Sequence, residues 1–149
     1  MERRGEYRGH NYPGLFISFD GGDGSGKSSQ FDKFLEYLGS KRYEFVRARD
    51  PGGTVIGEEI RKLLLHFDDA DMSPYAEFLL FEASRAQLTA EVIVPALVEG
   101  KIAVADRFYD STTAYQGAAG RVPLDLILVG NRAAAEGNTP DRTYFFDAP

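Results

Sequence analysis

The sequence contains no cysteine and no tryptophan, and its two histidines lie far apart in the chain. Without cysteine, a disulfide framework and a cysteine nucleophile are excluded, and the composition fits a reducing cytoplasm. His10 and His66 lack the close spacing of a histidine-built metal centre. No apolar run approaches the length that spans a bilayer, and residues 1–13 lack the apolar centre of a secretory signal. We therefore expect no membrane partner, and a polar leader over residues 1–13.

Basic residues are in deficit as well. Lysine and arginine together number 17 against 23 acidic residues, which gives a formal net charge of −6. A general nucleic-acid binder needs clustered basic side chains to neutralise phosphates, so this class is disfavoured. The balance instead favours a small anion in a local basic pocket. The 149 residues, 43% of them hydrophobic, suffice for one domain with its own core, expected over residues 14–149.

Short apolar runs alternate with segments of helical periodicity. Strands are expected at residues 15–19, 45–49, 102–105 and 144–146. Helices are expected at residues 28–38, 57–65, 90–99 and 124–135, with another that starts at Ser73-Pro74. This alternation predicts an α/β fold in which a parallel sheet lies between two helical layers. The carboxyl ends of its strands share one rim, which carries Asp20, Arg49, Asp106 and Arg107.

The stretch GGDGSGKS, between the first strand and the first helix, has the spacing of a phosphate-binding loop. It comprises Gly21, Gly22, Asp23, Gly24, Ser25, Gly26, Lys27 and Ser28. Glycines let the backbone approach an anion, and the N–H groups at the start of the next helix attract it. We expect Lys27 to reach the outer phosphates of a nucleoside triphosphate and the Ser28 hydroxyl to ligate Mg²⁺. A flexible glycine linker is the alternative, disfavoured by the flanking strand and helix.

Asp106 ends a buried strand, where an acid that organises magnesium lies in folds of this kind; the alternative is a turn-forming aspartate. The arginines on the separate expected elements suit a second phosphoryl group, because a guanidinium is planar and permanently charged. They are Arg49, Arg61, Arg85 and Arg107, and each taken singly is equally well a surface charge.

A nucleobase could be recognised beside the same rim. Gln116, next to the phenol of Tyr115, offers an amide donor and acceptor for a pyrimidine. Phe81 and Arg85 are four residues apart, so a helix places them on one side, as stacking and hydrogen bonding to a base would require. From periodicity alone, Phe81 is better interpreted as a core residue.

Five motifs in order resemble the bacterial type of the thymidylate kinase family. They are FDGGDGSGKSSQ, RDPGGTVIGEEIRKLLL, AEFLLFEASRAQ, DRFYDSTTAYQGAAGR and PDRTYFFD. The resemblance implies the P-loop NTPase-like fold of nucleoside monophosphate kinases. It also implies transfer of a phosphoryl group from ATP to dTMP with Mg²⁺, on the route to dTTP, by a cytoplasmic homodimer. The dimer would pack through the helices that hold Leu63-Leu64-Leu65 and Phe78-Leu79-Leu80, and Pro51 would follow a cis peptide bond.

The resemblance also implies roles for individual residues. Residues 21–28 would bind the ATP phosphates, Lys27, Asp23, Arg49 and Arg107 would be catalytic, and Ser28 and Asp106 would hold the metal. By the same resemblance, Phe81 stacks on thymine, Arg85 bonds its carbonyl edge, Tyr115 blocks a ribose 2′-hydroxyl and Gln116 contacts the base. The implied dTMP contacts are Asp23, Arg49, Arg61, Phe81, Arg85, Arg107, Ser111, Tyr115 and Gln116.

The sequence departs from the family pattern in two respects. Asp20 and Asp50 stand where glutamate is usual. The family also continues past the last expected strand with an arginine-rich lid that supplies a transition-state arginine when, as here, the phosphate loop has none. We therefore expect a C-terminally incomplete kinase domain with weak or no turnover but with most nucleotide contacts in place.

Three alternatives remain open at this point. In the first, the chain is a kinase whose acceptor is another pyrimidine nucleotide, such as dUMP. In the second, it is a nucleotide-binding module without catalysis. A phosphate-loop GTPase or DNA-bound ATPase is disfavoured by the acidic balance and by the lack of a guanine-reading Asn-Lys-x-Asp stretch.

Overall fold

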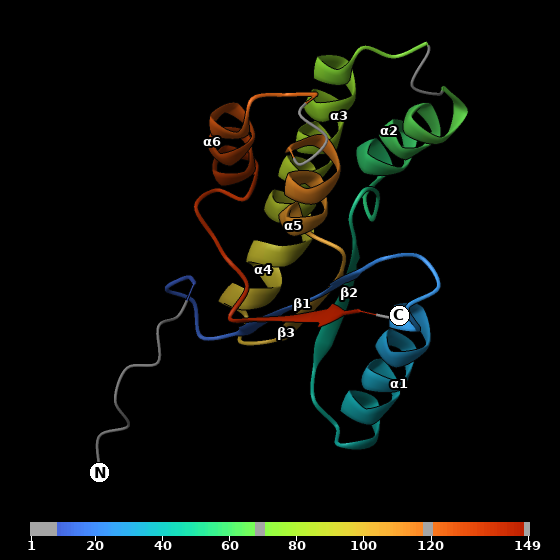
Figure 1. Cartoon of the computed structure of the whole chain (residues 1–149). Helices are drawn as coiled ribbons and strands as arrows, with labels where there is room; N and C mark the ends of the chain where they lie inside the picture. Colours follow the sequence, from blue (N-terminus) through green and yellow to red (C-terminus); the bar gives the residue numbers. More distant parts are fainter. Residues whose placement is uncertain (1–8, 68–70, 118–120, 148–149) are drawn as a thin grey trace.

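A parallel sheet forms the centre of the computed structural model, which describes residues 9–67, 71–117 and 121–147. The sheet has four strands in the order β2-β3-β1-β4, all paired in parallel (Figure 1). The strands are β1 (Leu15–Gly21), β2 (Phe45–Arg49), β3 (Ile102–Asp106) and β4 (Arg142–Phe146). The expected parallel α/β fold is confirmed, and β4 begins two residues before the expected strand.

Helices connect the strands as expected, with two differences. They are α1 (Lys27–Ser40), α2 (Val55–His66), α3 (Pro74–Leu88), the π-helical turn η1 (Thr89–Ile93), α4 (Val94–Val98), α5 (Tyr109–Thr112), the π-helical turn η2 (Thr113–Gly117) and α6 (Leu124–Ala134). The helical stretch expected at 90–99 is present as η1 and α4, but it continues α3 directly instead of forming a separate helix. The helical turns α5 and η2 were not expected from the sequence.

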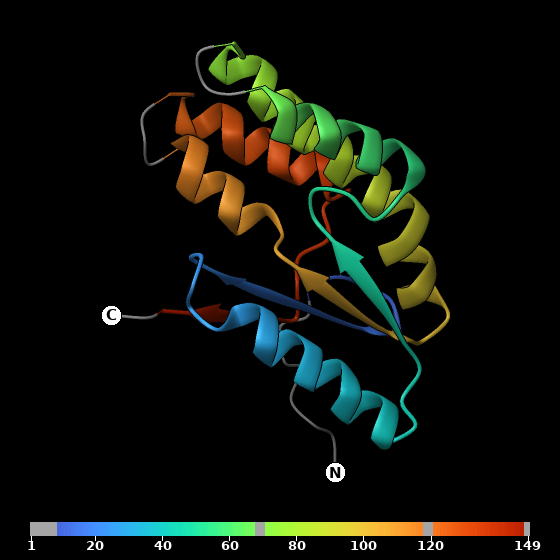
Figure 2. The same ribbon diagram turned by 90° about the vertical axis from the view of Figure 1, so that its right-hand side faces the viewer.

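The two sheet faces are covered unequally, as Figures 1 and 2 show together. Helix α1 covers one face, and α2 to α6 lie on the other side. Side chains of β1 alternate between them: Ile17 and Phe19 pack in a cluster with Phe31 of α1, whereas Phe16 packs with Leu97 on the opposite face. Burying a side chain such as Phe16 or Phe31 contributes about 2 kcal/mol, so the sheet is fixed from both faces.

Hydroxyl side chains cap the start of two helices. Ser73 accepts a hydrogen bond from the Ala76 N–H before Pro74 in the first turn of α3, which confirms the predicted helix start. Thr54 caps α2 in the same way by accepting from the Gly57 N–H at 2.9 Å. The Asp50–Pro51 peptide bond is cis, as the resemblance implied.

The described part of the expected leader packs against the domain. His10 is buried, and its Nε2 lies 2.8 Å from a carboxylate oxygen of Asp141, just before β4. The Thr139 N–H donates to the Gly9 carbonyl at 2.9 Å. Residues 9–13 thus contact the segment between α6 and β4, and residues 1–8 lie outside the described residues. None of the helices in the described ranges combines the length and apolar character of a membrane span.

Candidate active site

The glycine-rich loop joins β1 to α1 and opens onto a cavity of about 900 Å³. Gly26 precedes α1 with a φ of 83°, and a Cβ there would meet nothing within 4 Å. Glycine is therefore required at this position for its backbone conformation, while the space beside it stays open. The N-terminus of the 14-residue α1, with its free N–H groups and positive dipole end, suits an anion at this loop.

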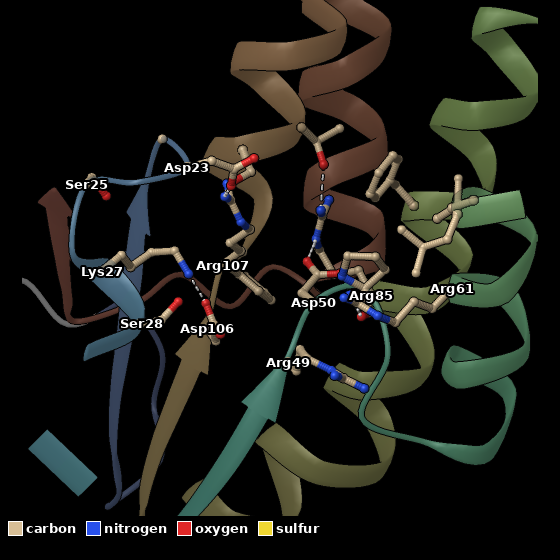
Figure 3. A pocket seen from close by; sticks show the side chains of 18 of the residues that line it. Asp23, Ser25, Lys27, Ser28, Arg49, Asp50, Arg61, Arg85, Asp106 and Arg107 are labelled. Atoms are coloured by element: carbon tan, nitrogen blue, oxygen red, sulfur yellow. Dashed lines mark hydrogen bonds and ion pairs between the residues drawn. The ribbon is translucent and has the colours of Figure 1, made fainter. Parts of the chain in front are cut away.

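Charged side chains from both halves of the chain line this cavity (Figure 3). Its acidic side chains are Asp23, Asp50, Glu77 and Asp106, and its basic side chains are Lys27, Arg49, Arg61, Arg85, Arg107 and Arg121. The cavity is thus more basic than acidic, although the whole chain carries −6. This is the local basic pocket that the charge balance favours.

Lys27 and Asp106 connect the phosphate loop to the end of β3. The Lys27 ammonium, which is buried, donates a hydrogen bond to the Asp106 carboxylate (Figure 3). Ser28, next along α1, lines the same cavity with an exposed hydroxyl-bearing side chain. A hydroxyl and a carboxylate are the oxygen donors that Mg²⁺ prefers, so these residues fit the metal that a nucleoside triphosphate brings.

Arg107 links the loop to a buried carboxyl group. Its guanidinium donates to Asp23 at 3.0 Å and to the Ser111 hydroxyl at 3.3 Å, and that hydroxyl donates to Asp20. Arg107 also has a φ of 67°, an unusual conformation for a residue with a side chain. Asp20 is only 1% exposed, and burial raises its pKa to about 6, opposed by the Ser111 hydrogen bond.

Arg49 and Arg61 lie on the other side of the cavity. Each donates a hydrogen bond to a residue at or just before the start of α2. Arg49 donates to Glu58 at 2.6 Å, and the Gly53 N–H donates to the same carboxylate oxygen at 2.7 Å. The Gly53 hydrogen bond and then that from Arg49 lower the pKa of Glu58. Arg61 donates to the Pro51 carbonyl at 3.0 Å. Both residues line the cavity, and each guanidinium donates a hydrogen bond there.

Arg85 has a different environment. It is 1% exposed and donates to Asp50 at 2.6 Å, Glu82 at 2.7 Å, Thr112 at 2.6 Å and Asn131 at 3.0 Å. Burial raises the pKa of both carboxyl groups, and the charge of Arg85 opposes that rise. One guanidinium between two carboxyl groups has no surplus positive charge to offer a phosphate. This end of the cavity therefore suits an uncharged polar group.

Phe81 lies one helical turn before Arg85 and also lines the cavity. Its side chain is only partly buried, so the core interpretation drawn from periodicity is wrong for Phe81. The core residue of this turn is Phe78, which is 1% exposed and packs with Val122 and Ile127. A ring at the wall beside Arg85 has the placement that stacking on a base requires.

Most of the predicted site residues share this cavity. Those that line it are Gly22, Asp23, Gly24, Ser25, Gly26, Lys27, Ser28, Arg49, Arg61, Phe81, Arg85, Asp106, Arg107 and Ser111. Gly21 belongs to β1 and does not line the cavity. The side chains of Tyr115 and Gln116 lie outside the described part of the chain.

The sequence analysis missed several cavity residues. Arg121 and Glu77 approach each other to 3.6 Å at the wall, and Leu64, Leu65 and Thr112 also line it. Asn131, which does not line the cavity, accepts a hydrogen bond from Arg85. One signal was readable: Asn131 lies four residues after Ile127 and three before Ala134, on the side of α6 that is buried. A polar residue in such a series indicates a buried hydrogen bond.

The fold and the loop define the class: a parallel α/β protein with a phosphate-binding loop at the carboxyl end of its first strand. The sequence model described as thymidylate kinase matches residues 19–149. The chain therefore belongs to the thymidylate kinase family.

Individual relatives agree. The chain is 48% identical over 135 residues to a thymidylate kinase of Kosmotoga olearia, covering 91% of this chain and 64% of the relative. It is 47% identical over 134 residues to one of an Exiguobacterium species, with 90% and 63% covered. The crystal structure of a thymidylate kinase from Ehrlichia chaffeensis superposes with a TM-score of 0.85 at 36% identity, over 91% of this chain and 77% of that one. The chain thus spans less than two thirds of the length of the first two relatives.

Proposed function

We propose that this chain acts as a thymidylate kinase and transfers the γ-phosphoryl group of ATP to dTMP, giving ADP and dTDP. One observation carries the proposal: a single cavity is lined by residues 22–28 of the loop, by Arg49, Arg61 and Arg107, and by the Phe81–Arg85 pair. Such a cavity has room for a triphosphate tail and a nucleoside monophosphate together. Membership of the thymidylate kinase family supports a cytoplasmic location.

The donor nucleotide is assigned to the loop side. The N–H groups of residues 21–28 and the start of α1 would bind the phosphates, and Lys27 would exchange Asp106 for a phosphate oxygen. Ser28 and Asp106 would hold Mg²⁺, which offsets phosphate charge when it is bound. The protein would mainly position oxygens in line and neutralise charge, with no covalent intermediate.

The acceptor is assigned to the opposite wall according to charge. Arg49, Arg61 and Arg107 would bind the dTMP phosphate, because their guanidinium groups line the basic part of the cavity. Asp23 would approach the sugar 3′-hydroxyl. Phe81 would stack on thymine and Arg85 would donate to a carbonyl oxygen, in keeping with the charge balance around Arg85. Ser111, Tyr115 and Gln116 complete the proposed acceptor contacts.

Exposed apolar side chains on α2 and α3 support a homodimer. Leu63 and Leu79 are exposed, Leu79 at 61%, whereas Leu64 and Leu65, which the resemblance placed at the interface, line the cavity. Phe78, which the resemblance placed at the same interface, is buried within the chain and therefore cannot contribute its ring. We infer a dimer that packs through the outer faces of these two helices.

Calorimetric titration with dTMP and with thymidine tests the acceptor assignment. The wild-type protein should bind dTMP, and Arg107→Ala should lower dTMP affinity about tenfold while thymidine affinity changes little, because only dTMP offers a phosphate. Arg132→Ala on the exposed surface of α6 is the matched control and should alter neither. Absence of dTMP binding to the wild type, or preference for dUMP over dTMP, would contradict the proposal.

A further inference from the structure

Asn131 stands behind the cavity wall and holds two parts of it together. It lies on α6, is 5% exposed and does not line the cavity. Its Oδ1 accepts from Arg85 at 3.0 Å, and its Nδ2 donates to the Thr113 hydroxyl at 3.0 Å. Thr113 is the first residue of η2, the turn that also contains Tyr115 and Gln116. The amide therefore joins the Arg85 guanidinium to this turn.

The partners fix the orientation of the amide. A guanidinium only donates, so the amide oxygen must face Arg85 and the NH₂ group must face Thr113. The Thr113 hydroxyl donates in turn to the Tyr109 carbonyl at 3.1 Å. Each group in this series thus has its donors and acceptors matched, and none of the three side chains can rotate without loss of a bond.

The orientation of the Asn131 amide matters because it affects the N–H donor of Arg85 that remains available to a ligand. A guanidinium has five N–H groups, and described residues accept from four of them: Asp50, Glu82, Asn131 and Thr112. The fifth is on the terminal nitrogen that also donates to Thr112, and Arg85 lines the cavity. The plane of the guanidinium therefore decides where this last N–H points, and Asn131 helps to fix that plane.

A close contact between helices places Asn131 at this position. A Cβ added to the preceding residue, Gly130, would lie 2.5 Å from the Phe78 ring and 3.4 Å from Cγ of Glu82. Only glycine permits α6 to approach α3 so closely, and this approach brings the next side chain within reach of Arg85.

We propose that Asn131 is a positioning residue for nucleobase recognition: it orients Arg85 so that the last guanidinium N–H meets a carbonyl oxygen of the base. The inference rests on the proposed function, which assigns the base to the Phe81–Arg85 end. Asn131 touches no ligand itself. It acts through Arg85 and through the start of η2, so its effect is confined to ligands that carry a base.

Titration with two ligands tests this. The probes are dTMP and 2-deoxyribose 5-phosphate, which share sugar and phosphate and differ in the base. Asn131→Ala should lower dTMP affinity about tenfold and leave deoxyribose 5-phosphate affinity unchanged, because only the base end loses its orientation. Arg132→Ala, one residue along α6 and exposed, should change neither affinity. Equal dTMP affinity in wild type and Asn131→Ala would overturn the inference while wild-type dTMP binding upholds the proposed function. Failure of the wild type to bind dTMP would overturn both.

A second pair of variants distinguishes the loss of positioning from a folding defect in Asn131→Ala. Thr113→Val keeps the shape of the side chain and removes the acceptor for the amide, whereas Thr113→Ser keeps the hydroxyl. The inference predicts a selective loss of dTMP affinity in Thr113→Val, about threefold, and recovery in Thr113→Ser. Equal effects of Thr113→Val on both ligands, or no effect on either, would contradict a positioning role.

Discussion

The individual arginines in this cavity carry the same charge but differ in their hydrogen-bond partners, so they differ in the charge they can offer a ligand. Arg107 lines the cavity and donates to the exposed Asp23 and to a hydroxyl, so its charge can act on an anion there. Arg85 lies between the Asp50 and Glu82 carboxyl groups and has no surplus charge. Residue type alone does not separate the proposed phosphate end of the cavity from the proposed base end; the partners of each guanidinium support that assignment.

At the residue scale, Lys27 offers a direct test of the phosphate loop. Lys27→Met keeps the length and removes the ammonium group, so a charge-assisted bond of ~2 kcal/mol to the phosphates is lost. We expect Mg·ATP affinity to fall about thirtyfold in a calorimetric titration. Lys33→Met, on the exposed face of the same helix, is the control. Unchanged ATP affinity in Lys27→Met would remove the loop from the donor site.

The raised pKa of Asp20 predicts that the free energy of unfolding depends on pH. Burial raises the pKa of its carboxyl group from 3.8 to about 6, so between these values the folded state binds the proton and the unfolded state does not. The free energy of unfolding therefore falls as pH rises, by ~1.4 kcal/mol between pH 5 and 7 from this group, and levels off above its folded pKa.

Urea unfolding of wild type and Asp20→Asn across this range isolates the contribution. The stability of Asp20→Asn relative to wild type should increase from pH 5 to pH 7, because only the wild type loses stability through Asp20. A constant difference between the two proteins would show that Asp20 does not titrate in this range.

At the scale of elements, the start of α2 sets the position of the segment that bears Arg61. Thr54 is buried and caps this helix by accepting from the Gly57 N–H. Thr54→Ala should lower the free energy of unfolding by about 1 kcal/mol, measured in urea, because a helix N–H loses its partner. Thr54→Ser retains the oxygen and should stay close to wild type. If alanine and serine behave alike, the cap contributes nothing.

Elements with a strong local pattern were predictable from the sequence, and those that depend on distant contacts were not. The strand, glycine loop and helix around Lys27 follow from apolar periodicity and turn chemistry, and the structure contains them. The turns α5 and η2 have no such pattern: the stretch from Tyr109 to Gly117 is largely polar. Ser111, Thr112 and Thr113 in this stretch bond Asp20, Arg85 and Asn131, which are distant in the chain.

The same limit applies to Phe78 and Phe81. Both fall in the apolar series of α3, and periodicity cannot tell which ring faces a cavity and which faces another helix. That distinction depends on α6, where Gly130 receives the Phe78 ring. The shared cavity of residues near glycines and strand ends was predictable for the opposite reason, since parallel strands gather their carboxyl ends at one rim.

At the scale of the whole molecule, charge is unevenly distributed, in agreement with the local basic pocket expected from the sequence. The chain carries −6, yet the cavity is more basic than acidic, so the acidic residues lie mainly elsewhere. The uneven distribution supports attraction of small anions to the cavity.

The homodimer is a prediction at this scale. Light scattering during gel filtration should show a dimer for the wild type and a monomer for Leu79→Glu, because a charge on the outer face of α3 would have to be buried at the interface. Val98→Glu, which changes an equally apolar, exposed side chain on α4, should remain dimeric. A wild-type monomer, or equal behaviour of the two variants, would refute the assigned interface.

The most direct test of the account is a crystal structure of the chain with ADP and dTMP. We predict that the ADP phosphates lie against residues 21–28 with Lys27 turned toward them, and that thymine stacks on Phe81 beside Arg85. Nucleotide density at another surface, or dTMP with its phosphate at Arg85 and its base toward Arg49, would contradict the account.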